Sequence, residues 1–408
     1  MSTPRIVVVG GGAGSAAAVA GLRQEGFDGE ITLISAEDTV PYERPPLSKD
    51  YLMGRSGSVL VKDPAWYEQQ SVELLIGRRA TRLDLAGSTV ALSDGSVIGY
   101  DQLLLATGVR PRVLPGIDGD GVCYLRTVRD AAELRDRIGA AGHVAVLGGG
   151  FIGCEVASAA MQLGKRATIL EALPTLLHRA LGPDLGEVVA ALHREAGVDV
   201  RTGQQVNGLT PRPGGGVRIT TGDGPVDADV LVVGVGTVPN QELAEQAGLP
   251  VGGGILVDEH FATAVPRVWA VGDVASQHLP GYGRRVRVEH HDTALRHGRA
   301  VARNMLGQRE PFRDVHWFWS DQFEHTIQSA GLAEVTGPLV IRGSLEQRSF
   351  SAFSLDGDRL RGVISLNRPR DVLDARRLIA RDHHATVDQL RDESLPLKRL
   401  VPSAAAAP

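Results

Sequence analysis

The chain carries two glycine-rich turns, and each one follows a run of apolar residues. IVVVGGGAGS spans residues 6–15, and VLGGGFIGCE spans residues 146–155. A continuous β-branched run is typical of a parallel strand that is buried on both faces, and the small residues after each turn predict a helix. A second apolar run follows each helix, EITLIS at 30–35 and RATILE at 166–171. The chain is therefore predicted to contain two βαβ units, offset by 138 residues, in an α/β fold.

The residues within these turns have the spacing of a dinucleotide-binding fingerprint. The three fingerprint positions are Gly10, Gly12 and Ser15 in the first unit, and Gly148, Gly150 and Gly153 in the second. The first glycine allows the tight turn, the second lets the backbone approach a pyrophosphate, and the third position sets how closely helix and strand pack. A phosphate would lie at the helix N-terminus, where N–H groups and the helix dipole favour an anion. A lone glycine turn is often only a turn, but two copies in complete βαβ units predict two Rossmann-like dinucleotide-binding domains.

An acidic residue after the second strand of each unit is a candidate for binding a ribose. Glu171 ends the second strand of the second unit, 23 residues after Gly148. A carboxylate there accepts hydrogen bonds from a ribose diol and repels a 2′-phosphate, by roughly 4 kcal/mol at about 4 Å and an effective dielectric near 20. The second unit is therefore predicted to prefer NADH over NADPH. In the first unit Ala36 is followed by Glu37 and Asp38, and Glu37 is our candidate.

Composition limits what else the chain can do. The 408 residues are enough for two or three domains, and a formal net charge of −5 indicates neither a nucleic-acid nor an anionic-membrane partner. No apolar run reaches the roughly 18 residues that a membrane span needs. Cys123 and Cys154 form no CxxC motif, which fits a reducing cytoplasm. The pairs His290–His291 and His383–His384 lack metal-ligand spacing, so no metal site is predicted.

Further segments carry glycine or charged residues near predicted strands. LLLATGVRP (103–111) and LVVGVGTVPN (231–240) are predicted strands that end in glycine turns, and VWAVGDVA (268–275) is an apolar strand that ends at Gly272 and Asp273. An acid at the carboxyl end of a buried strand is either a helix cap or a ligand for hydroxyl groups. PYERPPLSKD (41–50) is a loop by composition, and its stiff prolines could lie flat against a planar ring beside Lys49.

The order of these motifs resembles that of a known enzyme family. The segments PYERPPLSK, ATG, YLRT, GGGFIGCE, VWAVGD, VEHHDTA, FWSDQF and NRP occur in the order typical of FAD-dependent ferredoxin reductases of the putidaredoxin reductase and biphenyl-dioxygenase reductase type. That family belongs to the glutathione-reductase-like superfamily. The resemblance implies a discontinuous FAD-binding domain at 1–112 and 242–312, an NADH-binding domain at 113–241, and a C-terminal α+β domain at 313–408 that covers the flavin.

The resemblance also implies site residues, motif by motif. The residues implied for FAD are Gly10, Gly12, Gly14, Glu37, Arg44, Lys49, Ala80, Thr107, Gly108, Arg126, Gly272, Asp273, His291 and Trp319. Those implied for NADH are Gly148, Gly150, Ile152, Gly153, Glu155, Glu171 and Arg179. Lys49, paired with Glu155, would position the flavin ring as the catalytic pair. Two positions depart from the family pattern, because Ala36 stands where relatives often have an acid and His291 where many have a bulky apolar residue.

The absence of cysteines near the predicted flavin narrows the chemistry. Related disulfide reductases need a redox cysteine pair beside the flavin, whereas residues 36–55 contain no cysteine and Cys154 is expected to pack as a small apolar residue. The resemblance then implies hydride transfer from NADH to FAD across about 3–3.5 Å, followed by direct release of single electrons to a small 2Fe–2S ferredoxin. That ferredoxin would feed an oxygenase, either a haem monooxygenase or a ring-hydroxylating dioxygenase.

The alternative functions are those of a rubredoxin reductase and of an NADH-responsive redox-sensing flavoprotein like apoptosis-inducing factor. We expect a monomer or weak dimer.

Two features are candidates for the surface where electrons leave. HWFWSDQFEH (316–325) is either part of the core of the C-terminal domain or a segment that turns Trp319 toward the partner. Arginines gather in two stretches, Arg284, Arg285 and Arg287, and then Arg368, Arg370, Arg376, Arg377 and Arg381. A basic rim would steer an acidic ferredoxin, and a solvated face is the alternative. The terminal SAAAAP is expected to be disordered.

Overall fold

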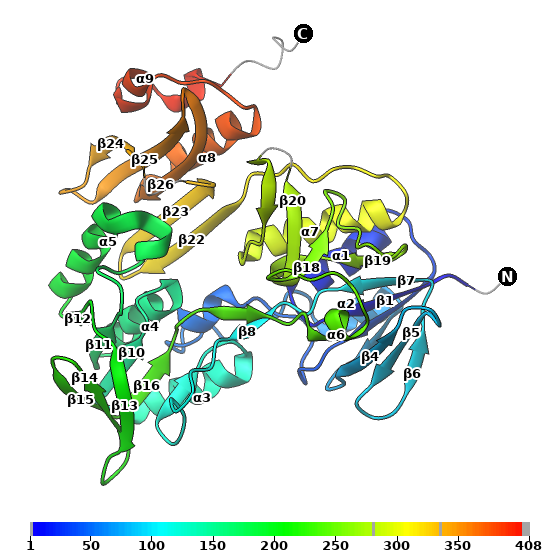
Figure 1. The fold of residues 1–408 in the computed structure, drawn as a ribbon, viewed down its shortest axis with the longest axis horizontal. Coiled ribbons are helices and arrows are strands. Elements are labelled where there is room, and N and C mark those ends of the chain that lie inside the picture. The colour runs from blue at the N-terminus through cyan, green and yellow to red at the C-terminus, as the bar shows by residue number, and fades with distance from the viewer. Residues whose placement is uncertain (1–2, 280–281, 334–336, 402–408) are drawn as a thin grey trace. The chain divides into compact units, whose positions relative to one another are not determined.

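The computed structural model describes residues 3–279, 282–333 and 337–401, and the chain divides into two compact units. The first unit comprises Met1–Arg44, Ser58–Arg110 and Thr237–Asp314, and the second comprises Pro45–Gly57, Pro111–Gly236 and Val315–Pro408. Each unit contains one of the two predicted βαβ motifs (Figure 1). The SAAAAP segment lies outside the described residues.

The first unit is built on a five-stranded parallel sheet. Its strands, in spatial order, are β19 (Val268–Ala270), β7 (Gln102–Leu105), β1 (Arg5–Val9), β2 (Glu30–Ile34) and β3 (Val72–Leu75). Four of the five residues of β1 and of β2 are buried, as expected for strands covered on both faces. The predicted helix is α1 (Ala13–Gln24), and Gly26, at a φ of 87°, follows its end as predicted.

Helix α1 packs closely against α7 (His291–Met305) in the first unit. A Cβ atom on Gly298 would lie only 2.4 Å from the carbonyl oxygen of Gly14, and one on Gly21 would lie 2.8 Å from the Cβ of Ala302. The small residues of AGSAAAVAG therefore let the two helix backbones approach each other. This contact holds the N-terminus of α1, and with it the first glycine turn, on a rigid support.

Smaller elements complete the first unit. They are α2 (Pro64–Gln69), β4 (Ala80–Asp84), β5 (Thr89–Leu92), β6 (Val97–Gly99), β8 (Val109–Pro111), β17 (Thr237–Pro239), α6 (Glu242–Gln246), β18 (Ile255–Val257), the 3₁₀ helix η2 (Gly272–Val274), β20 (Ala275–Leu279) and β21 (Arg284–Val286). Strands β4–β5–β6 and β18–β20–β21 form two three-stranded sheets, and β8 pairs with β17.

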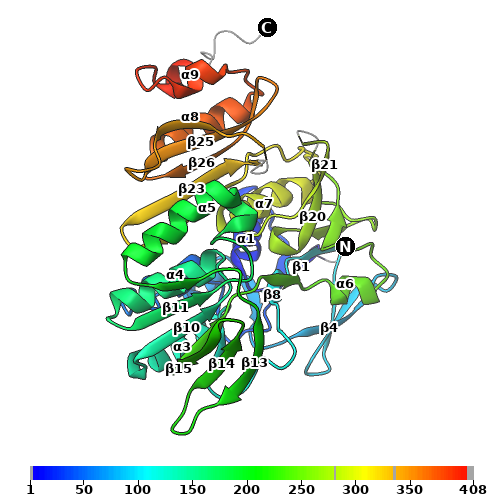
Figure 2. The same cartoon turned by 60° about the vertical axis from the view of Figure 1, so that its left-hand side comes forward.

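The second unit repeats the parallel architecture. Its sheet has the order β12 (Asp199–Arg201), β11 (Arg166–Leu170), β10 (His143–Leu147), β16 (Val230–Val233) and β9 (Val122–Tyr124). The helices are α3 (Val128–Ala140), α4 (Phe151–Gln162) and α5 (His178–Glu195), and β13 (Val206–Pro211), β14 (Val217–Thr221) and β15 (Gly224–Ala228) form an antiparallel sheet (Figure 2). All five residues of β10 are buried, in agreement with the prediction for HVAVLG.

The second unit also contains an antiparallel sheet made by the C-terminal part of the chain. Its order is β22 (Trp317–Gln322), β23 (His325–Gly331), β26 (Arg359–Leu366), β25 (Ser349–Asp356) and β24 (Val340–Ser344). It is followed by α8 (Pro369–Ala380), α9 (Val387–Arg391) and the 3₁₀ helix η4 (Leu397–Arg399). The fold class is confirmed: two Rossmann-like parallel sheets and a C-terminal α+β region.

One local expectation needs correction. The segment 41–50 is not entirely loop, because Pro45–Ser48 form a 3₁₀ helix, η1, in the second unit. Pro45 and Pro46 have the fixed φ that a helix start requires, and a missing N–H costs nothing in a first turn. This helix fixes the position of Ser48 and of Lys49 directly after it.

Candidate dinucleotide and flavin sites

The first glycine turn has one position where a side chain cannot fit and one where space is open. Gly10 has a φ of 132°, and a Cβ atom there would lie 2.1 Å from the carbonyl oxygen of Ala106. At Gly12 the reverse holds, because no heavy atom lies within 4 Å of a Cβ position. Gly12 is also the N-cap of α1, and no side chain caps that helix end. Open space beside uncapped N–H groups fits the pyrophosphate of a dinucleotide.

The second glycine turn has the same construction. A Cβ atom on Gly148, whose φ is 106°, would lie 2.5 Å from the carbonyl oxygen of Gly234. At Gly150, the uncapped N-cap of α4, the nearest heavy atom lies 4.0 Å away. The third positions differ: a Cβ atom on Gly153 would lie 2.0 Å from the Gly148 carbonyl oxygen, whereas Ser15 is accommodated with its side chain fully buried. Both turns therefore fit a dinucleotide, and they differ in that the first accommodates a side chain at its third position whereas the second does not.

Glu171 is tied directly to the second glycine turn. Its Oε2 accepts a hydrogen bond from the Gly149 amide at 2.6 Å, and its Oε1 accepts one from the Leu173 amide at 2.7 Å. These bonds hold the carboxylate at the end of β11 beside the turn. The predicted ribose-binding acid is therefore at the strand end that its spacing indicated, and its role in binding NADH stays a prediction.

The first unit has no acid at the corresponding strand end. The amides of Gly10 and Gly148 donate to Ile34 and Leu170 respectively, each at 2.8 Å, so Ser35 is the structural counterpart of Glu171. A Cβ atom on Gly11 would lie 2.3 Å from the Ser35 Oγ, which places this hydroxyl beside the turn. Ser35 was not predicted from the sequence, although an alignment of the two strand ends identifies it.

Glu37, the predicted acid of the first unit, lies two residues beyond Ser35. Its carboxylate accepts hydrogen bonds from the Tyr42 hydroxyl and from the Arg44 guanidinium, the latter at 2.7 Å. Burial alone would lower the pKa of Arg44, but the charges of Tyr42, Glu37 and Asp273 outweigh it and raise this pKa above its ordinary value. Arg44 therefore stays a cation that holds Glu37 in place, and the role of Glu37 toward a ribose stays a prediction.

The other predicted FAD residues of the first unit lie at strand ends or strand starts. Gly272 has a φ of 72°, and Asp273 lies within η2, directly after β19. Thr107 follows β7, donates from its hydroxyl to the Asn240 carbonyl at 2.7 Å, and accepts at its own carbonyl from Asn240 Nδ2 at 2.8 Å. Gly108 accepts the Asn240 amide, and Ala80 begins β4. Asn240, which the sequence analysis did not single out, thus holds the Thr107 turn.

His291 begins α7 and lies near a carboxylate. Its Nε2 is 3.9 Å from Glu43 Oε1. Burial lowers the pKa of His291, against the opposing charges of Glu43, Asp292 and Asp273. Burial also lowers the pKa of the neighbouring His290, to about 4. Both imidazoles are therefore neutral at pH 7, and no group of three potential metal ligands occurs among the described residues.

The expected pair of Lys49 and Glu155 is present in the second unit. Lys49 Nζ lies 2.8 Å from Glu155 Oε1 and also donates to the Pro45 carbonyl at 3.3 Å. The carboxylate is 4% exposed and accepts two further hydrogen bonds, from the Ser48 hydroxyl and from the Ser320 hydroxyl at 2.6 Å. A buried charge is stable only when it is paired and hydrogen-bonded, and here both conditions hold. Neither Ser48 nor Ser320 was predicted from the sequence to contact this pair.

The remaining predicted residues of the second unit are arranged around α3, α4, α5 and β22. Arg126 precedes α3, and its amide donates to Asp130 at 3.0 Å. Ile152, in the first turn of α4, leaves 44% of its surface exposed, which is unusual for an isoleucine beside a glycine turn. Arg179 is exposed in the first turn of α5. Trp319 is half-buried on β22 and stacks on Trp317, with ring centroids 5.1 Å apart.

Neither cysteine has the surroundings of a redox thiol. Both thiols are buried, and Cys154 donates a weak hydrogen bond to the Gly149 carbonyl at 3.6 Å. Burial raises the pKa of Cys154 strongly, and the charges of Glu155 and Glu171 add to the effect. Burial is also the main reason that the pKa of Cys123 is raised. A thiolate is the reactive form, so both residues pack as small apolar groups.

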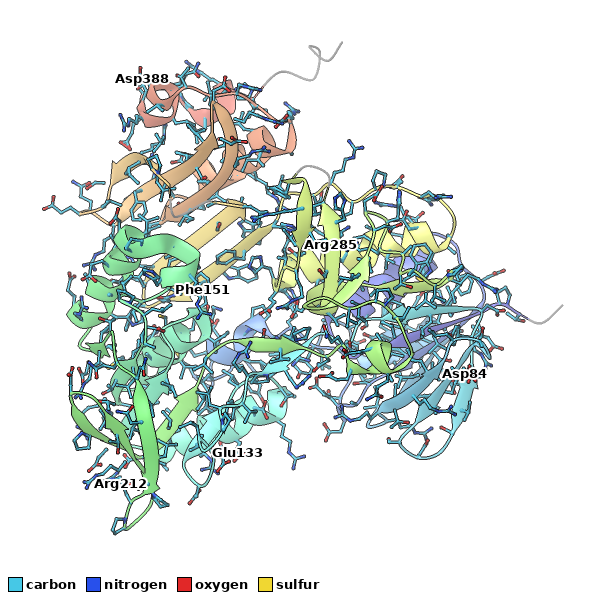
Figure 3. The ribbon with its side chains drawn as sticks, viewed as in Figure 1. Asp84, Glu133, Phe151, Arg212, Arg285 and Asp388 are labelled. Atoms are coloured by element: carbon cyan, nitrogen blue, oxygen red, sulfur yellow. The ribbon has the colours of Figure 1, made fainter. Side chains whose placement is uncertain are left out.

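Several arginines of the predicted exit surface already have partners. Arg285, which is labelled in Figure 3, donates from Nη1 to the carbonyls of Val257 and Ser276, both at 2.8 Å. Arg287 pairs with Glu289 at 2.5 Å, and Arg368 pairs with Asp371 at 2.9 Å. These contacts favour a structural role for the three arginines, although Arg285 is exposed, as Arg284 and Arg370 are. No described helix combines the length and the apolar composition that crossing a membrane requires.

Comparisons with known proteins agree with this arrangement. A family model described as pyridine nucleotide-disulphide oxidoreductase matches residues 4–298, and one described as reductase C-terminal matches residues 317–401. Putidaredoxin reductase CamA from Pseudomonas putida is 38% identical over 411 residues, covering 98% of this chain and 97% of that protein. The ferredoxin–NAD(+) reductase component of the anthranilate 1,2-dioxygenase system from Burkholderia cepacia is 39% identical over 403 residues, covering 98% of this chain and 99% of that protein.

A solved structure extends the likeness to the whole fold. The crystal structure of the covalent putidaredoxin reductase–putidaredoxin complex matches with a TM-score of 0.95 at 37% identity, and the match covers 100% of both chains. The two glycine turns, the buried Lys49–Glu155 pair and the C-terminal sheet all lie within the matched residues. The chain therefore belongs to the pyridine nucleotide-disulphide oxidoreductase family, and within it is similar to the ferredoxin reductases that the motif order indicated.

Proposed function

We propose that this protein is an NADH:ferredoxin reductase, a flavoprotein that passes electrons from NADH through FAD to a small 2Fe–2S ferredoxin. The observation that carries the proposal is the presence of two complete dinucleotide turns, at Gly10–Gly12 and Gly148–Gly150, in one chain. Proteins of this family use FAD and NAD(H), so one turn is expected for each. Bound FAD would supply the conversion of a two-electron hydride donor into a source of single electrons, which side chains cannot perform.

The residues of the first unit are proposed to hold the adenosine, pyrophosphate and ribityl parts of FAD. Gly10, Gly12 and Gly14 would admit the pyrophosphate at the N-terminus of α1, and Glu37 would bind the adenosine ribose while Arg44 holds it. The strand-end residues Thr107, Gly108, Gly272 and Asp273, with Ala80 and His291, complete the proposed set. This assignment is supported by the open space at Gly12 and by the position of Asp273 after a buried strand.

The residues of the second unit are proposed to bind NADH and to orient the flavin ring. Gly148, Gly150 and Gly153 would form the pyrophosphate turn, with Glu171 at the ribose, and Ile152 and Arg179 would contact the rest of NADH. Lys49 and Glu155 would position the flavin ring, and Arg126 and Trp319 would lie near it. The exposed Ile152 supports the assignment, because an apolar side chain at a turn is suited to cover a nucleotide.

The proposed route for electrons out of the flavin is direct. Both cysteines are buried thiols with raised pKa values, so neither is suited to relay electrons. The similar reductase components belong to dioxygenase systems or act on named small redox proteins, and one solved relative is bound to putidaredoxin. We therefore propose a ferredoxin partner that feeds an oxygenase.

We also propose that the chain is divided functionally into three domains, with boundaries at residues 113, 242 and 313.

Anaerobic rapid mixing tests this proposal. The purified protein is reduced with one equivalent of NADH and mixed with an oxidised 2Fe–2S ferredoxin, while flavin and iron–sulfur absorbance are followed. Reoxidation of the flavin together with bleaching of the iron–sulfur centre is the expected result. A flavin that NADH reduces but that no iron–sulfur protein reoxidises would contradict the reductase function and favour an NADH-responsive sensor.

A further inference from the structure

A chain of four buried polar residues ends at the carboxylate of Glu155. His193 Nε2 lies 2.9 Å from Gln322 Oε1, Gln322 Nε2 lies 3.1 Å from Ser320 Oγ, and Ser320 Oγ lies 2.6 Å from Glu155 Oε1. The four residues come from α5, β22 and α4, all within the second unit, and β22 packs against α4 (Figure 1). Their exposed fractions are 0% for His193, 1% for Gln322, 0% for Ser320 and 4% for Glu155. Water therefore has no access to replace any of these bonds.

The direction of donation along this chain follows from the chemistry of its two ends. As the ion-pair partner of Lys49, the Glu155 carboxylate only accepts, so the Ser320 hydroxyl must donate its one proton to it. The Ser320 oxygen must then accept from the Gln322 amide nitrogen, which leaves Gln322 Oε1 facing His193. Because that oxygen only accepts, His193 must carry its proton on Nε2. All three donors therefore point toward Glu155, and such aligned bonds polarise one another.

We propose that Ser320, Gln322 and His193 are positioning residues that hold the Glu155 carboxylate against Lys49 for the reduction of the flavin by NADH. The inference rests on the proposed function and deepens it, because it assigns roles to three residues outside the predicted flavin and NADH contacts. Ser48 and Lys49 approach the carboxylate from the η1 segment, and Ser320 approaches it from β22. Without the Ser320 hydroxyl, Lys49 Nζ is the one partner of Oε1 left among the described contacts, and it is shared with the Pro45 carbonyl.

The buried His193 is suited to a fixed role as the first residue of this series of hydrogen bonds. Burial lowers the pKa of His193 to about 4, although the bond to Gln322 opposes the shift. The ring is therefore neutral at physiological pH and keeps a single proton. His193 also packs edge-on against Phe323, with ring centroids 5.2 Å apart, which fixes the plane of the imidazole.

Ser158 offers a matched control on the same two elements. It lies on α4, three residues after Glu155, and its hydroxyl accepts the Phe323 amide at 2.7 Å and Gln162 Nε2 at 3.2 Å. Ser158→Ala thus removes a buried hydroxyl that ties α4 to the end of β22, as Ser320→Ala does, but the described hydrogen bonds of that hydroxyl go to Phe323 and Gln162 and not to Glu155. The two variants separate loss of packing from loss of support for the carboxylate.

The first test compares Ser320→Ala and Gln322→Leu with Ser158→Ala in the FAD-loaded protein, without ferredoxin. We expect the rate of flavin reduction at saturating NADH to fall about tenfold in Ser320→Ala, less in Gln322→Leu, and to stay within about twofold of wild type in Ser158→Ala. Spectroelectrochemistry should give a more negative flavin potential in Ser320→Ala, because the negative charge of a carboxylate that loses a hydrogen-bond donor is less compensated. Equal rates and potentials in Ser320→Ala and Ser158→Ala would overturn the proposal.

The second test needs neither FAD turnover nor a soluble Ser320→Ala variant. Histidines labelled with ¹⁵N are examined by long-range proton–nitrogen NMR in the wild-type protein, and the His193 signals are assigned by their loss in His193→Asn. We expect a neutral ring protonated on Nε2 across pH 6 to 9. A ring protonated on Nδ1, or on both nitrogens, would overturn the proposed direction of hydrogen-bond donation from His193 to Glu155. Neither test uses a ferredoxin, so its failure is distinct from failure of the reductase assay.

Discussion

The two glycine turns share a backbone but differ in the groups that surround it. In the second unit Glu171 accepts the Gly149 amide, and Gly153 leaves no room for a side chain. In the first unit Ser35 stands at the strand end, Ser15 is accommodated, and the acid is displaced to Glu37 beside Arg44. The comparison teaches that the tight turn and the open helix N-terminus are the fixed parts of such a site. The acid and the third fingerprint position are the parts that differ between the two units.

Exchanging the third fingerprint residues should produce the largest effect. Gly153→Ser would place a Cβ atom 2.0 Å from the Gly148 carbonyl oxygen, so we expect a loss of about 3 kcal/mol or more in the free energy of unfolding. Ser15→Gly creates no such overlap and should cost about 1 kcal/mol or less, because glycine weakens a helix. Chemical denaturation of both variants measures the difference. Equal losses would show that the two third positions are packed alike.

Exchanging the residues at the strand ends should alter the choice of nucleotide. Glu171→Ser gives the second turn the strand-end residue of the first, and removes the charge that would repel a 2′-phosphate. We expect the preference for NADH over NADPH, measured as the ratio of kcat/KM values, to fall about tenfold, since Glu171 is partly exposed and its charge is screened.

Glu37→Gln is the control for that exchange. It removes the acid of the first unit, so it should weaken retention of FAD during dialysis and leave the nucleotide preference unchanged. Loss of NADH preference in Glu37→Gln, with none in Glu171→Ser, would reverse the proposed assignment of the two units.

Each unit also contains a histidine whose protonation should oppose folding in acid, and of these His193 is fully buried and His290 partly buried. The pKa of His193 in the second unit and that of His290 in the first are both lowered to about 4, in each case mainly by burial. An unfolded histidine has a pKa near 6.5, so between about pH 6.5 and 4 the unfolded chain binds more protons than the folded one. Stability should therefore be fully present above about pH 6.5 and should fall by about 3 kcal/mol per histidine as pH drops to 4.

Variants separate these two contributions. His193→Gln should flatten the pH dependence of the hydrogen-exchange protection factors in α5 and β22, and leave that of the protection factors in α7 unchanged. His290→Gln should do the reverse. A pH dependence that survives in both variants would assign the acid sensitivity to carboxylates instead.

The sequence predicted the parts of the molecule that repeat a local pattern. β1, α1, β2 and their counterparts β10, α4 and β11 were predictable because buried parallel strands and small-residue helices leave a continuous signal. Glu171 was predictable from its spacing. The pairing of Lys49 with Glu155 came only from the family resemblance, because 106 residues separate the two and no local rule connects them.

The rest of the site depends on contacts that no local pattern records. Ser320 and Gln322 follow the aromatic residues of β22 in the sequence WFWSDQ, and polar residues at the end of a strand give no sign that they face a buried carboxylate. In the sequence, His193 resembles an ordinary polar residue near the end of a helix, yet it is fully buried. Ser35 was overlooked because a serine at a strand end resembles a turn residue. Each of these residues acquires its role from a partner that is distant in sequence.

Removing the thiols should have the smallest effect. Cys154 lies on α4 directly after Gly153, in a position where the first unit has Ala16 after Ser15, so a methyl group is already accepted at the equivalent point. Cys154→Ala should therefore leave electron transfer from NADH to a ferredoxin within about twofold of wild type and cost about 1 kcal/mol of stability. Cys123→Ala should behave alike. The double variant decides the matter, because it contains no sulfur other than that of methionine. If the double variant failed to pass electrons to the ferredoxin while its flavin was still reduced by NADH, a thiol would have to lie on the route by which electrons leave the flavin. The two units would then differ in their chemistry and not only in the nucleotide that each is proposed to bind.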